Sequence, residues 1–73
     1  MGPFSLYNTL LNEGQFEGGF DKFNMKMSKD TSYRKEVFDY ISDPSSLGIV
    51  DYNTGVLTPA PKTFEEFENI FYT

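Results

Sequence analysis

Large apolar residues recur at helical spacing along most of the chain. Two stretches, 20–27 and 64–71, share the pattern F-(D/E)-x-F with a further apolar residue at the eighth position. Apolar positions i, i+3 and i+7 lie on one stripe of an α-helix, so both stretches are predicted to be amphipathic helices. Each follows a helix-like segment and a glycine-bearing turn. The pattern therefore predicts two diverged copies of one helix-turn-helix pair, in half-units 5–27 and 33–73.

Capping residues set the ends of the other two predicted helices. Ser5 is predicted to cap a first helix over 6–13, and Gly14 to end it in a left-handed conformation. A third helix is predicted over 33–42 and stops at Asp43-Pro44, because proline lacks an amide hydrogen. Three candidate caps precede that helix: Asp30, Thr31 and Ser32.

The last helix has the clearest start. Thr63 and Glu66 have the spacing of a capping box, in which Thr63 accepts from the amide of Glu66 and the Glu66 carboxylate reaches back. The segment 47–62 before it is the least helical part of the chain. Two short apolar pairs flank a turn with Asn53 and Gly55, which predicts an extended loop or a short hairpin.

These elements predict one small all-α domain over 1–73, with about four short helices and an irregular or hairpin segment at 47–62. Its core is predicted to contain Leu6, Leu10, Phe20, Phe23, Val37, Phe38, Ile41, Phe64, Phe67 and Phe71.

The chain is short and rich in aromatic residues. It has 73 residues, eight Phe and five Tyr, and it has no cysteine with which to form a disulfide. A domain of this size is near the lower limit for folding alone. The rings supply a core, and those that exceed it are expected to contact a partner protein.

Charge and residue types exclude several functions. The net charge is −5, which argues against nucleic-acid binding, since that depends on Lys and Arg neutralising phosphates. No apolar run is long enough to cross a bilayer, and no secretory signal is predicted. Five of the cations lie between positions 22 and 35, whereas three glutamates lie in the last helix.

The sequence offers few side chains suited to catalysis or metal binding. Neither His nor Cys is present, so the commonest general base and the commonest metal ligands are missing. The stretch from Asp51 to Gly55 starts like a calcium loop, but its glycine is out of register and position twelve is Lys62. We therefore expect a non-enzymatic protein with no cofactor, no metal site and no catalytic residues.

The order of the apolar positions resembles a small helical module of tailed-bacteriophage virion-associated proteins. The resemblance spans most of the chain and is carried by Leu6-Tyr7, Phe20-Asp21-x-Phe23, Tyr33-Arg34, Val37-Phe38 and Phe64-x-x-Phe67. It implies a structural or accessory protein of a phage particle, found in the virion or in the host cytoplasm during infection. Its partners would be larger virion proteins or copies of itself, bound by aromatic helix faces.

Seven residues are predicted to contact such a partner. They are the surplus rings and the acidic cluster of the last helix: Tyr7, Phe16, Tyr52, Tyr72, Glu65, Glu66 and Glu68. The acidic cluster also leaves open a second function, a small phage-encoded inhibitor that blocks a host defence protein by imitating nucleic acid. The cations in the middle of the chain count against mimicry over the whole surface, so the structural function is preferred.

Overall fold

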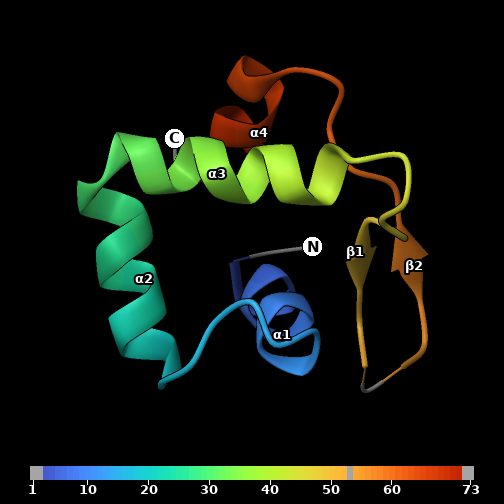
Figure 1. Cartoon of the computed structure of the whole chain (residues 1–73), viewed down its shortest axis with the longest axis horizontal. Coiled ribbons are helices and arrows are strands. Elements are labelled where there is room, and N and C mark those ends of the chain that lie inside the picture. Colours follow the sequence, from blue (N-terminus) through green and yellow to red (C-terminus); the bar gives the residue numbers. More distant parts are fainter. Residues whose placement is uncertain (1–2, 53, 72–73) are drawn as a thin grey trace.

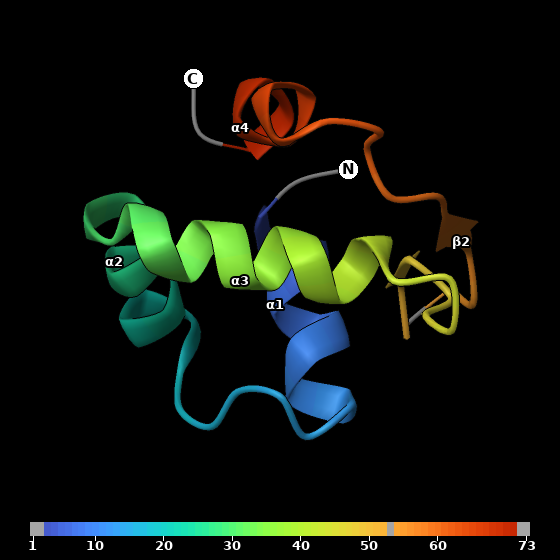
Figure 2. The same cartoon turned by 45° about the horizontal axis from the view of Figure 1, so that its top comes forward.

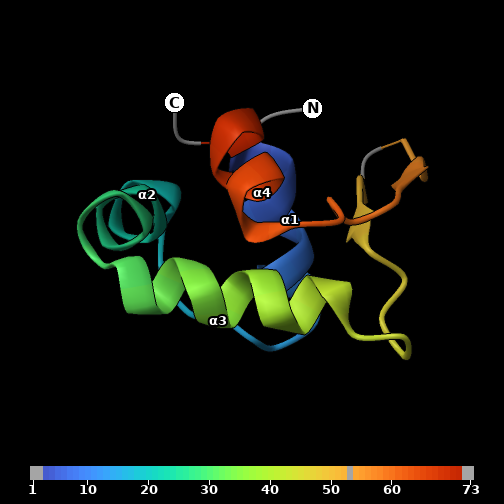
Figure 3. The same cartoon turned by 90° about the horizontal axis from the view of Figure 1, so that it is seen from above.

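The computed structural model describes residues 3–52 and 54–71. It contains four helices, α1 (Pro3–Asn12), α2 (Phe20–Lys29), α3 (Thr31–Ser42) and α4 (Phe64–Phe71), and two strands, β1 (Ile49–Val50) and β2 (Leu57–Thr58). Helix α3 runs along the molecule, with α2 at one end and the hairpin at the other (Figures 1 and 2). Helices α4 and α1 lie above and below α3 in Figure 1, and seen from above both lie toward the same side of it (Figure 3). The prediction of a mostly helical domain with a short hairpin is confirmed.

The structure gives no support to a repeated helix-turn-helix pair. Helices α1 and α2 are joined by a short loop, whereas the connection between α3 and α4 carries the whole hairpin. Helix α1 also packs directly on β1, which belongs to the other predicted half-unit. The two F-x-x-F helices therefore share a spacing of apolar residues and lie in different surroundings.

The core lies where the four helices and β1 meet. Eight of the ten predicted core residues are buried, and the other two, Phe20 and Phe64, are partly buried and pack against the rest. The buried side chains outside the predicted core include Tyr7, Thr9, Met27, Ile49 and Val50. Two of these come from β1, so the hairpin contributes to the core.

Local capping explains most of the helix ends. Gly14 has φ +74° after α1, and the amide of Gln15 donates to the Leu10 carbonyl at 2.8 Å, as expected for a glycine-terminated helix. Asp30 caps α3 by accepting from the amide of Tyr33 at 3.1 Å. The prediction that Ser5 caps the first helix is wrong. That helix begins at Pro3, and proline suits a first-turn position because its missing amide hydrogen has no partner there anyway.

Helix α4 begins with a variant of the predicted capping box. The Thr63 hydroxyl accepts from the amide of Glu66 at 3.1 Å, as expected. The Glu66 carboxylate accepts from the amide of Lys62 at 3.2 Å, one residue before the expected donor.

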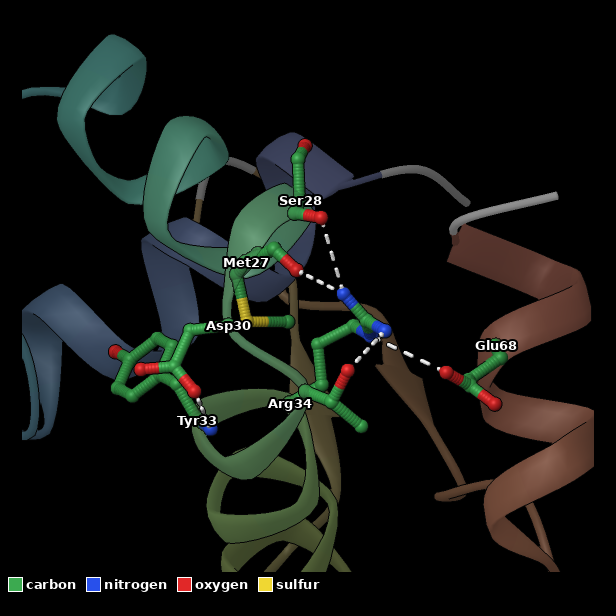
Figure 4. A network of polar contacts seen from close by, with 7 residues as sticks. Met27, Ser28, Asp30, Tyr33, Arg34 and Glu68 are labelled. Atoms are coloured by element: carbon green, nitrogen blue, oxygen red, sulfur yellow. Dashed lines mark hydrogen bonds and ion pairs between the residues drawn. The ribbon is translucent and has the colours of Figure 1, made fainter.

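Arg34 joins three helices through one guanidinium group (Figure 4). It donates to the Met27 carbonyl at 2.7 Å and the Ser28 carbonyl at 3.2 Å, near the carboxyl end of α2. It also donates to the Thr31 hydroxyl at 3.0 Å and pairs with the Glu68 carboxylate at 3.2 Å. The carbonyls at a helix end lack partners in the helix, and a cation complements the dipole there. Arg34 therefore fixes the α2–α3 corner against α4.

Candidate docking surface

Two of the predicted contact residues belong to the core region. The Tyr7 side chain is buried, and its hydroxyl donates to the Gly18 carbonyl at 2.8 Å. Phe16 is half-buried and meets the ring of Phe23 edge-on, with a centroid distance of 5.2 Å. Tyr7 is thus a core residue rather than a surplus ring, because the loop before α2 folds over it and supplies the partner for its hydroxyl.

The three glutamates of α4 do not act as one acidic cluster. Glu68 forms the ion pair with Arg34, and Glu66 accepts from the amide of Lys62. Glu65 is exposed. Tyr72, the last predicted contact residue, lies outside the described residues.

Tyr52 is exposed and ties the hairpin turn to the helices. Its hydroxyl donates to one oxygen of the Glu13 carboxylate at 3.1 Å, and the hydroxyl of Tyr40 donates to the other at 2.6 Å. The hydrogen bond to Glu13, helped by partial burial, raises the pKa of Tyr40 to about 12. Loss of solvent around the Tyr52 hydroxyl and its bond to Glu13 also raise the pKa of Tyr52.

The large apolar side chains that remain exposed are concentrated in and beside the hairpin. Among the described residues there are eight of them, and four lie between positions 47 and 57. We call these four the hairpin surface: Leu47 (70% exposed), Tyr52 (46%), Val56 (57%) and Leu57 (55%). Only Tyr52 among them was predicted to contact a partner. The other three were predicted to be strand or loop residues, because the local sequence around an aliphatic residue does not indicate whether its side chain is covered.

A groove runs beside Leu47 and Leu57. Its volume is about 390 Å³, and its apolar lining comes from Ile41, Leu47, Gly48, Leu57, Pro59 and Ala60. A second pocket of about 500 Å³ shares Asp43, Ser46 and Leu47 with the groove and is also lined by Glu13 and Tyr40. At their common border the Ser45 hydroxyl and amide both donate to the Asp43 carboxylate, which lowers the pKa of Asp43.

The chain segment that supplies the hairpin surface carries little charge of its own. The stretch from Pro44 to Pro61 holds one charged residue, Asp51, on a chain whose net charge is −5. Asp51 is half-buried, and its carboxylate accepts from the amide of Thr54 at 3.3 Å within the turn. The exposed apolar side chains therefore come from a stretch with one charged residue, although the carboxylates of Glu13 and Asp43 from the helical part lie beside Tyr52 and Leu47.

The two edges of the hairpin differ in how their backbone groups are satisfied. The strands are antiparallel, with Val50 opposite Leu57, and the amide of Asp51 donates to the Val56 carbonyl at 2.9 Å. Hydrogen-bonded pairs alternate along such a ladder, so the amide and carbonyl of Val50 face away from β2 and those of Leu57 face away from β1. In Figure 1 β2 is the strand farther from α1.

The inner edge is closed by a side chain of α1. The Thr9 hydroxyl accepts a hydrogen bond from the amide of Val50 at 2.9 Å. As a donor, the same hydroxyl lies within reach of two carbonyl oxygens, that of Val50 at 2.9 Å and that of Ser5 at 3.0 Å. Thr9 is fully buried. The outer edge has no such closure, because no other group in the described part of the chain pairs with the amide or carbonyl of Leu57.

The other kinds of site receive no support from the geometry. Within residues 3–52 and 54–71, no group of three or more acidic side chains is placed to hold a metal ion. None of the described helices has the length and apolar character needed to cross a membrane. Comparison with protein families, curated proteins and solved structures gave no match to this chain.

Proposed function

We propose that this chain is a non-enzymatic docking protein that binds a larger protein through the hairpin surface. The observation that carries the proposal is the concentration of exposed apolar side chains, Leu47 and Leu57 above all, on a stretch with a single charged residue beside a groove. Clusters of this kind commonly mark sites of protein association. The resemblance of the apolar spacing supplies the context, a small structural or accessory protein of a tailed-bacteriophage particle.

The proposed contact differs in place from the aromatic helix faces expected from sequence. The rings of α2 and α4 pack mainly inward, as do Tyr7 and Phe16. Of the predicted aromatic contacts that the structure describes, Tyr52 is on the hairpin surface. Docking by aliphatic side chains and one tyrosine thus replaces docking by a helical aromatic stripe.

The test is co-sedimentation with particles from cells infected with the phage that encodes the chain. We expect Leu47→Ser to reduce particle-bound protein by roughly tenfold, since burying a leucine side chain is worth about 1.5–3 kcal/mol and part of it is already covered. The matched control is Met25→Ser, an equally large change at a 58% exposed position on α2. It should leave the particle-bound fraction unchanged.

Two results would contradict the proposal. Equal loss in both variants would mean that the contact does not depend on the hairpin surface. The wild-type chain could instead be recovered only in the cytosol, bound to a host protein. If Glu65→Gln and Glu66→Gln abolish that binding, the result favours the acidic inhibitor.

A further inference from the structure

The open edge of β2 offers a backbone donor and a backbone acceptor to another chain. The amide and carbonyl of Leu57 face away from β1, and the Leu57 side chain beside them is 55% exposed. An unpaired strand edge is a template for pairing with a further strand. The closed edge at Val50 cannot act in this way, because Thr9 already occupies it.

The edge geometry favours a second copy of this chain as the occupant, because the outward amide and carbonyl belong to one residue, Leu57, and a two-fold pair can satisfy both. Two copies with a net charge of −5 repel each other wherever their acidic surfaces meet. Residues 55–59, which comprise β2 and its flanks, carry no charge, so pairing along β2 places no like charges directly opposite each other. We propose that two copies associate by antiparallel pairing of β2 with β2, which forms a four-stranded sheet. The inference rests on the proposed function, in that it names one occupant of the docking surface.

The register of this pairing follows from the edge geometry. A two-fold axis through the Leu57 pair lets each Leu57 amide donate to the Leu57 carbonyl of the second copy, so both outward groups are satisfied. Val56 then lies opposite Thr58 of the second copy, a pair of β-branched residues that suits neighbouring strands. No other register satisfies both Leu57 groups with a symmetric pair.

The same pairing would enlarge the docking face. Leu57 and Leu47 both line the groove, whereas Val56 and Thr58 line a separate hollow with Ser5 on the other face of the hairpin. A dimer joined along β2 therefore brings the two grooves onto one continuous face. The contact itself is short, so it should fall below the area of about 1,200 Å² typical of stable interfaces, and the dimer should dissociate on dilution.

Sedimentation equilibrium of the purified chain, from micromolar to millimolar concentration, tests the inference. We expect the weight-average mass to rise from one chain toward two. Leu57→Lys places two like charges beside the axis and should weaken the association at least tenfold. Met25→Lys introduces the same charge at a similarly exposed position, 58% against 55%, and should leave the association unchanged. Circular dichroism checks that both variants retain the helical fold.

Hydrogen exchange provides a second readout that does not depend on a substitution. Protection of the Leu57 amide should increase with protein concentration, while protection of the Val50 amide stays constant because Thr9 already holds it. A chain that is monomeric at millimolar concentration, or a dimer weakened equally by both lysine variants, would overturn the inference.

The two proposals fail in different ways. A monomeric chain whose particle binding still depends on Leu47 would refute β2 pairing and retain docking. A dimer that never associates with particles would refute the proposed function and retain the pairing.

Discussion

The two strands of the hairpin differ in burial. Ile49 and Val50 of β1 are buried against α1, whereas Leu57 of β2 and Val56 just before it are more than half exposed. The backbone shows the same contrast, because the groups of Val50 are held by Thr9 and those of Leu57 have no partner in the described chain. A two-stranded ribbon is marginal by itself, so β1 anchors the hairpin and β2 is held by β1.

One hydroxyl group accounts for much of this difference. Threonine at position 9 places a donor and acceptor on the buried face of a helix, where an aliphatic residue would be expected. That hydroxyl lets α1 pack directly on a strand edge without leaving the polar groups of Val50 unpaired. The contrast between the strands can be tested by removing the hydrogen bonds between Thr9 and Val50.

The largest effect is expected from Thr9→Val, which keeps the side-chain volume and removes the hydroxyl. The amide and carbonyl of Val50 would then be buried without this partner, and each such group costs about 1–3 kcal/mol. We expect the free energy of unfolding to fall by about 2–4 kcal/mol, measured by urea denaturation. Exchange of the Val50 amide should become faster as well.

Thr9→Ser is the matched control for that change. Serine keeps the hydroxyl and loses a methyl group, so it should be less destabilising than valine although valine is the more apolar residue. A valine variant as stable as the wild type would show that the Thr9 hydroxyl does not hold β1.

Most features that depend on neighbours in sequence were predictable, with the start of α1 at Pro3 as the exception. Asp30 and Thr63 cap helices within three residues of themselves, and Gly14 ends α1 through the turn that precedes it. The apolar spacing of α2 and α4 likewise identified their buried faces, since helical periodicity is local.

Features that depend on distant residues were not predictable. Thr9 meets Val50 across 41 positions, and no local pattern distinguishes it from a solvated threonine. The exposure of Leu57 against the burial of Val50 depends on which strand α1 covers. For the same reason the candidate site was placed on the rings and glutamates, and of these Tyr7 and Glu68 are committed to internal contacts.

A smaller effect is expected from Gly48→Ala, which tests the close approach of β2 to the start of β1. Gly48 has φ +86°, and a methyl group there would lie 2.6 Å from the carbonyl oxygen of Thr58. Left-handed backbone costs a non-glycine residue about 1–2 kcal/mol, and the contact adds to it. We expect a loss of about 2–3 kcal/mol in thermal or urea unfolding.

Gly55→Ala separates the two causes. Gly55 has a similar φ of +77°, but nothing lies within 4 Å of the added methyl group. The excess loss in the Gly48 variant measures the contact with β2. Equal losses in the two variants would mean that β2 moves away without cost.

The smallest effect is expected at the surface, where the Glu13 carboxylate accepts hydrogen bonds from the hydroxyls of Tyr40 and Tyr52. The pKa of Tyr40 is about 12 in the fold, against an ordinary value of 10.0, because its hydroxyl donates to Glu13. Because folding raises the pKa of Tyr40, its protonated hydroxyl stabilises the folded chain. This stabilisation is complete below pH 10 and is lost as the pH rises toward 12 and the hydroxyl loses its proton. The hydrogen bonds between Thr9 and Val50 involve no titrating group, so β1 should stay bound to α1 over the same pH range.

We therefore expect the free energy of unfolding to decline between pH 10 and about 12, with a smaller decline in Tyr40→Phe. The comparison with this variant is needed because the pKa values of Tyr33 and Tyr52 are raised too. Urea denaturation at several pH values measures the free energy of unfolding. Hydrogen exchange at lower pH measures how strongly the Val50 amide is protected before the tyrosines titrate. If wild type and Tyr40→Phe lose stability in parallel, the bond from Tyr40 to Glu13 contributes nothing measurable to the stability of the fold.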